Sequence, residues 1–186
     1  MKFVYKNRRG HNYYLKSGLT PKGNKKYYLF KQMTADDLET VPDGYEVFEN
    51  VHGGVFIRKL RPSILLPSEM GVLEKKVATY QKEVRYEEKG KSIILYHITN
   101  SGLFREESFA ALAFRSGVLD IDKFGDYMQM FCFELMDPTE RLFAPYRWCT
   151  RSAKEYWLNI GSPNSLKKLI EKYLHHINQD SFYELH

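Results

Sequence analysis

Residues 12–31 read NYYLKSGLTPKGNKKYYLFK. The stretch holds two short runs rich in tyrosine and leucine, Asn12–Lys16 and Lys26–Lys31, which suit the half-buried surface of a β-sheet. Between them stands a turn sequence, Thr20–Asn24, in which glycine and asparagine tolerate positive φ and proline fixes φ at about −65°. This stretch therefore predicts two antiparallel strands joined by a tight turn.

Strand patterns continue on both sides of this stretch. Upstream, the run Lys2–Lys6 is followed by the turn sequence Asn7–Gly10, which completes a three-stranded antiparallel meander. Downstream, the runs Tyr45–Glu49 and Val55–Lys59 flank Val51–Gly54, whose paired glycines permit a sharp reversal. The first third of the chain is thus predicted to contain a meander and a second hairpin.

After Pro62 the hydrophobic pattern changes to a helical period. Ser68 is a suitable N-cap, and one stripe follows at 3.6-residue spacing; it consists of Met70, Leu73, Val77 and Tyr80. Two strands are expected next, Val84–Glu88 and Ile93–Ile98, and the second is apolar enough to be central in a sheet.

The carboxyl-terminal third contains a further hairpin between two helical patterns. Ser108–Arg115 is predicted to form a short buried helix, because Ser116-Gly117 would stop it. Tyr127–Leu135 and Arg141–Trp148 form a hairpin through Asp137-Pro138-Thr139, and Pro145 indicates an edge strand or a bulge.

The last helix has the strongest signal. Ser162 is the expected N-cap and Pro163 the first helical residue, where the missing N–H costs nothing. One apolar stripe follows; it consists of Leu166, Leu169, Ile170, Tyr173, Leu174 and Ile177.

Together these patterns predict an α+β fold, with an antiparallel meander and hairpins at the amino terminus and a mixed or antiparallel sheet covered by two or three helices toward the carboxyl terminus. We expect residues 1–186 to form a single domain. The alternative is a basic β subdomain, residues 1–60, followed by an α+β subdomain, residues 61–186.

Charge is distributed unevenly along the chain. Residues 1–31 hold nine of the 28 basic residues and none of the 23 acidic ones, so the remainder has 19 basic groups and a net charge of −4. Cys132 and Cys149 are too far apart for a zinc or redox pair and are expected as buried thiols. No apolar run is long enough to span a bilayer, and the start lacks the apolar core of a secretory signal. We therefore expect a cytoplasmic protein with no membrane partner.

Part of the sequence resembles an uncharacterised group of bacterial proteins. The residues that carry the resemblance lie mostly in the first third of the chain; they are Tyr13-Tyr14-Leu15, Leu19–Gly23, Lys26-Tyr27-Tyr28, Pro42–Val47 and Val55–Lys59, with weaker similarity around Trp157 and at Ser181–Leu185. The resemblance implies a bacterial, cytosolic protein and supplies no site residue.

The basic meander is the main candidate for a binding site. Its cations alternate with aromatic residues, and cations attract phosphates while exposed rings stack on unpaired bases. The candidate nucleic-acid-binding residues are Arg8, Arg9, Lys16, Lys22, Lys25, Lys26, Tyr13 and Tyr27. Two other interpretations remain open: the lysines solvate an outer face, or the basic segment docks on a protein. In each Tyr-Tyr pair the two side chains point to opposite faces of the strand.

Signs of metal binding or catalysis are weak. Asp120–Asp126 begins like a calcium loop, but Phe131 stands where the twelfth position requires glutamate. Asp43 with Glu87–Lys89, or Glu74–Lys76 on a predicted helix, contains the residue types of a metal-dependent nuclease, in which carboxylates hold Mg²⁺.

The histidines have structural explanations. His97 is expected to be a hydrogen-bonded core residue, and His175 and His176 are favourable near a helix C-terminus. His11 and His52 are turn residues. We therefore expect no catalytic residue, no metal and no cofactor. The first hypothesis is a non-catalytic nucleic-acid-binding protein, the alternative is a protein-binding or homodimeric protein, and the third is a nuclease-like enzyme.

Overall fold

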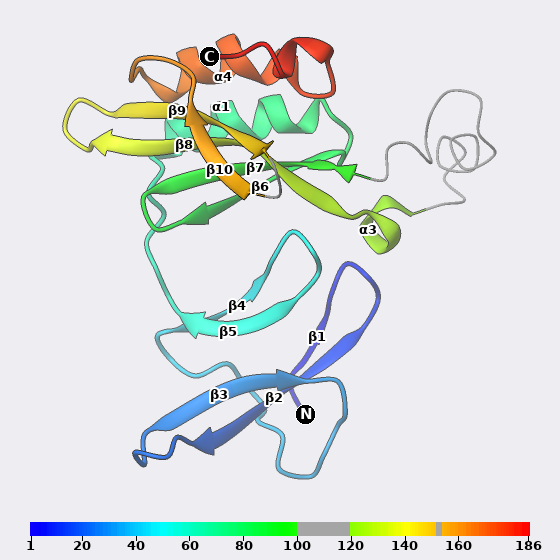
Figure 1. Cartoon of the computed structure of the whole chain (residues 1–186). Helices are drawn as coiled ribbons and strands as arrows, with labels where there is room; N and C mark the ends of the chain where they lie inside the picture. The colour runs from blue at the N-terminus through cyan, green and yellow to red at the C-terminus, as the bar shows by residue number, and fades with distance from the viewer. Residues whose placement is uncertain (100–119, 152–153) are drawn as a thin grey trace. The chain divides into compact units, whose positions relative to one another are not determined.

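A computed structural model describes residues 1–99, 120–151 and 154–186 of the chain (Figure 1). The chain divides into two compact units: Met1–Pro62 with Asp122–Phe124, and Ser63–Ile121 with Gly125–His186. We call them unit 1 and unit 2. Every strand pairing among the described residues is antiparallel, and helices accompany the sheets, which confirms the predicted α+β class.

Unit 1 begins with the predicted meander. Strands β1 (Val4–Lys6), β2 (Asn12–Leu19) and β3 (Lys25–Phe30) lie in the order β1-β2-β3. Gly10 and Gly23 take φ of 83° and 79° in the two turns, a conformation that glycine adopts without strain. The meander is therefore confirmed, with β2 three residues longer than its predicted run.

The second hairpin of unit 1 has the predicted bounds, β4 (Tyr45–Glu49) and β5 (Val55–Lys59). Buried Asn7 fastens it to the first turn of the meander, because its Nδ2 donates to the Gly53 carbonyl at 2.7 Å and its Oδ1 accepts from the His11 N–H at 2.8 Å. The Tyr27 and Tyr45 rings also meet edge to face, 4.9 Å between centroids.

Unit 2 contains one five-stranded sheet in the order β10-β9-β8-β7-β6. Its strands are β6 (Val84–Lys89), β7 (Ser92–Ile98), β8 (Tyr127–Asp137), β9 (Leu142–Arg151) and β10 (Lys154–Asn159). Helices α1 (Pro67–Ala78) and α4 (Leu166–Tyr173) cover one face of it (Figure 1). The remaining helical pieces are short: α3 (Ile121–Phe124) and the 3-10 turns η2 (Leu174–His176) and η3 (Asp180–Phe182).

The core of unit 2 lies between this sheet and the two helices. Alternate residues of the strands contribute to it, and a β-bulge in β8 adds one more: Leu95 faces Phe131 and Tyr96 faces Gln129, so Met130 is inserted and is also buried. The predicted stripe of the last helix is buried in full, comprising Leu166, Leu169, Ile170, Tyr173, Leu174 and Ile177.

Both helices begin at residues other than those predicted. The N-cap of α1 is Leu66 rather than Ser68, because Pro67 takes the first helical position and a residue before proline is disfavoured in the helical region. The N-cap of α4 is Ser165 rather than Ser162. Asn164 exchanges two backbone hydrogen bonds with Phe143 of β9, at 2.9 and 3.0 Å, and this bridge keeps the preceding chain extended.

The proline in β9 lies inside the sheet, which corrects the expected edge strand or bulge. Its carbonyl accepts from the Ile160 N–H at 3.1 Å, so the backbone groups of Pro145 point toward β10. The last pair of the β9–β10 ladder is Tyr146 with Asn159, so the nitrogen of Pro145 lies just beyond the end of that ladder. No ladder hydrogen bond is lost there. Strand β10 was not predicted, and the predicted helix Ser108–Arg115 lies outside the described residues. Within the described parts of the chain, no helix has the length and apolar character needed to cross a membrane.

Candidate nucleic-acid interface

The pairing of the meander divides its side chains into two faces, because successive residues of a strand point to opposite sides. We call one the open face; it carries Val4, Lys6, Asn12, Tyr14, Lys16, Gly18, Lys26, Tyr28 and Phe30. We call the other the Leu15 face, after its fully buried leucine; it carries Tyr5, Tyr13, Leu15, Ser17, Leu19, Lys25, Tyr27 and Leu29.

Two aromatic side chains stand exposed on the open face of β3. Tyr28 is 36% exposed and Phe30 is 52% exposed. Their ring centroids are 6.2 Å apart with an interplanar angle of 78°. Gly18 lies beneath Tyr28, since a Cβ built on it would be 3.4 Å from the ring's Cε1. The absence of a side chain at Gly18 leaves room for the tyrosine ring on this part of the sheet.

The lysines of the open face differ in what they contact. The Lys26 Nζ is 5.7 Å from the Tyr28 ring centroid, and its side chain is otherwise in solvent. The Lys16 Nζ is 5.6 Å from the Phe30 ring but also lies 3.3 Å from the Asp37 carboxylate and 2.8 Å from the Thr34 hydroxyl. Lys16 therefore fastens the 34–37 turn to the sheet, whereas Lys26 is available to an external anion.

Burial, which raises the pKa of Asp37, is outweighed by two hydrogen bonds from Thr34 and by the Lys16 ammonium, so the pKa of this carboxyl is lowered. The buried side chain is thus an anion that holds Lys16 in place.

The two arginine candidates belong to the framework of unit 1. The Arg8 Nε lies 3.9 Å from Glu49, and the Arg8 backbone N–H donates to the same carboxylate at 3.1 Å. The Tyr5 hydroxyl donates to Glu49 at 2.9 Å. Burial is the larger cause, and the Glu49 carboxylate the smaller one, that together raise the pKa of Tyr5 to about 12. Arg9 packs over Gly53, where a Cβ would be 3.1 Å from its side-chain carbons.

The other predicted residues are divided between the turn and the Leu15 face. Lys22 and Lys25 are exposed around the β2–β3 turn. Tyr13 is half-buried, with the Lys31 Nζ 5.9 Å from its ring, and Tyr27 packs on Tyr45. Of the predicted residues, the structure therefore places Lys16 and Lys26 on the open face. The two rings near them, Phe30 beside Lys16 and Tyr28 beside Lys26, were not among the predicted residues.

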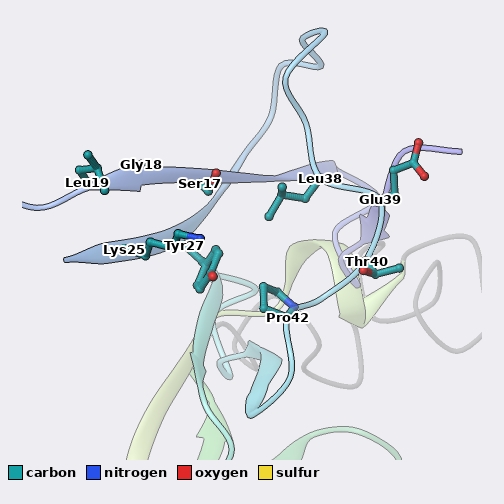
Figure 2. Close-up of a pocket in the computed structure, with 9 residues that line it drawn as sticks. All are labelled: Ser17, Gly18, Leu19, Lys25, Tyr27, Leu38, Glu39, Thr40 and Pro42. Carbon is teal, nitrogen blue, oxygen red and sulfur yellow. The ribbon is translucent and has the colours of Figure 1, made fainter. Parts of the chain in front are cut away.

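A hollow of about 420 Å³ lies on the Leu15 face beside β2 (Figure 2). Its walls come from the end of β2, from β3 and from the segment that leads toward β4. The lining residues are Ser17, Gly18, Leu19, Lys25, Tyr27, Leu38, Glu39, Thr40 and Pro42. Two of the predicted residues, Lys25 and Tyr27, thus border a hollow on the side opposite to the exposed rings.

The metal and nuclease patterns gain no support from their surroundings. Among the residues that the structure describes, no three metal-binding side chains come together. Residues 121–124 of the calcium-like stretch form the short helix α3. Asp43 lies in unit 1 while Glu87–Lys89 lie in unit 2, where Lys89 Nζ is 3.4 Å from buried Glu87; Glu74–Lys76 lie on α1, as predicted.

His97 and both cysteines are buried, and His176 is held by a hydrogen bond. His97 is buried in the core as expected, and burial lowers its pKa. The expected hydrogen bond is not found at Nε2, which makes none to a described residue and lies 3.9 Å from Glu83. His176 shares a 2.8 Å hydrogen bond with the Ser181 hydroxyl and lies against the His175 ring. Cys132 and Cys149 are buried free thiols, as expected.

No protein-family model, no curated protein and no solved structure matches this chain.

Proposed function

We propose that the protein binds single-stranded nucleic acid, without catalysing a reaction, on the open face of its meander. The observation that carries the proposal is the pair of exposed rings, Tyr28 and Phe30, on a sheet with lysine beside them. Unpaired bases stack on such rings, while the phosphates that link the bases favour nearby cations. In a duplex the faces of the bases are already stacked, so a single strand fits this surface better.

Charge supports the same class of ligand. The first 31 residues carry nine basic and no acidic residues, and a one-sided positive field steers a polyanion toward the surface. On the open face and in the β2–β3 turn, the lysines that can contribute are Lys6, Lys22 and Lys26, because each is exposed and forms no ion pair within the described residues.

The test is fluorescence anisotropy with a labelled ten-nucleotide strand of RNA or DNA and with the corresponding duplex. We expect the single strand to bind more tightly than the duplex. Tyr28→Ala and Phe30→Ala should each weaken single-strand binding by about 1–3 kcal/mol, roughly 5- to 150-fold.

Phe56→Ala is the matched control, because Phe56 is a 53% exposed ring on β5 in the same unit. It should leave binding unchanged. Preference for the duplex, or equal losses in all three variants, would contradict stacking on the open face.

The second candidate function is docking on an acidic protein surface, which the segregation of charge also favours. This alternative predicts that binding to a protein partner weakens strongly as salt rises and is unchanged when Tyr28 or Phe30 is replaced. A protein that binds no oligonucleotide at low salt would favour this alternative.

A further inference from the structure

Among the described residues, one edge of β2 has no neighbouring strand for part of its length. Strand β2 pairs with β3 along Tyr14–Leu19, but with β1 only along Asn12–Tyr14. The Thr20 N–H donates to Asn24 at 2.8 Å, so even-numbered residues of β2 direct their backbone groups toward β3. The Leu15 carbonyl points the opposite way and accepts from the Leu38 N–H at 2.8 Å.

By this alternation, the N–H and C=O groups of Ser17 and Leu19 point away from β3. The described part of the chain supplies no hydrogen-bond partner to them. Charged side chains and prolines usually prevent an exposed edge from pairing with another strand. The stretch Ser17-Gly18-Leu19 contains neither. The side chain of Leu19 is also 66% exposed. This edge is therefore chemically suited to accept another strand.

The hollow of about 420 Å³ lies on the Leu15 face of this stretch, and Ser17, Gly18 and Leu19 line part of it (Figure 2). Its size falls within the range of ligand-binding pockets. Leu19, Leu38 and Pro42 give it an apolar lining. Of its two charged residues, Glu39 pairs with the N-terminal ammonium at 3.3 Å, whereas Lys25 has no ion pair among the described residues.

We propose that this edge binds a short extended peptide by β-augmentation. The peptide backbone pairs with Ser17 and Leu19, one apolar side chain enters the hollow, and a carboxylate of the peptide lies near Lys25. A second copy of the chain is a poor occupant, because a stable dimer needs about 800 Å² from each partner and this free edge is three residues long. This site is separate from the open face, so it does not depend on the proposed function.

The experiment is selection of displayed random heptapeptides against the full-length chain, followed by anisotropy with the enriched peptides in synthetic, labelled form. We expect alternating peptides with an apolar and an acidic residue. N-methylation of alternate amides should weaken them on the order of tenfold for each pairing amide removed. Leu19→Glu should abolish binding without unfolding the protein, because Leu19 is exposed, and Lys25→Ala should weaken it.

Several outcomes would overturn the proposal. They are failure to enrich any peptide, enriched peptides that tolerate N-methylation, and enriched peptides that bind Leu19→Glu as well as the parent. Sedimentation that shows a dimer disrupted by Leu19→Glu would replace the peptide with a second copy. Phe30→Ala, on the open face and at the other end of β3, should leave peptide binding unchanged, so the two sites can fail independently.

Discussion

The salt dependence of nucleic-acid binding should distinguish lysines that contact phosphates from lysines that support the fold. Each phosphate contact to a single strand contributes about −0.7 to the slope of log K against log salt. With Lys6, Lys22 and Lys26 in contact, the slope would be about −2, or a roughly 100-fold loss of affinity per tenfold rise in salt. The double variant Lys22→Ala/Lys26→Ala should leave about −0.7, roughly a fivefold loss.

Lys16→Ala is the informative comparison. Lys16 lies on the same face, but its ammonium is already 3.3 Å from the Asp37 carboxylate. Removing it should leave the slope unchanged while lowering the stability of unit 1, because buried Asp37 then loses its cation.

The assay is fluorescence anisotropy with a labelled ten-nucleotide single strand across a salt series, with urea unfolding of each variant as a check of the fold. Phosphate contact by Lys22 and Lys26 would be refuted if Lys16→Ala flattened the slope as much as Lys26→Ala, or if the double variant kept the parent slope.

Three further predictions concern stability and reactivity. The pKa of Asp37 is lowered in the folded state. The contribution of this carboxylate to stability is therefore present above about pH 4, the ordinary pKa of aspartate, and is lost as pH falls through the lowered pKa. Urea unfolding across acid pH should show this loss in the parent and not in Asp37→Asn. Tyr173→Phe should destabilise by about 1–2 kcal/mol in urea unfolding, because the buried hydroxyl donates to the Ile160 carbonyl at 2.9 Å. Burial raises the pKa of Cys132, so a thiol reagent should label it slowly in the native protein and rapidly in urea, and fast native labelling would contradict the packing.

Local turn chemistry explains why the hairpins could be predicted. Residues such as Gly10 and Gly23 mark reversals whatever surrounds them, and the bounds of β4 and β5 were predicted to the residue. The helix starts depend on the rest of the fold instead. No pattern near Ser162 in the sequence predicts the β-bridge between Asn164 and Phe143, which moves the start of α4 to a later residue.

The faces of the meander were the hardest feature to predict. Both faces carry tyrosine and lysine, so composition does not distinguish them. The available signal was the position of the two leucines, Leu15 on β2 and Leu29 on β3, which are cross-strand partners and so share one face. It places Tyr27 on their side and Tyr28 on the other. Strand β10 was missed because Lys154 and Glu155 give its start the appearance of a loop.

The two outer strands of the five-stranded sheet affect how the protein associates with other copies at high concentration. Strand β6 contains Arg85, Glu87, Glu88 and Lys89, and β10 begins with Lys154 and Glu155. Charges of both signs on a border strand oppose its extension by further chains. Fibrillar growth from unit 2 is therefore disfavoured at either border, and colloidal association at high concentration is expected to begin in unit 1.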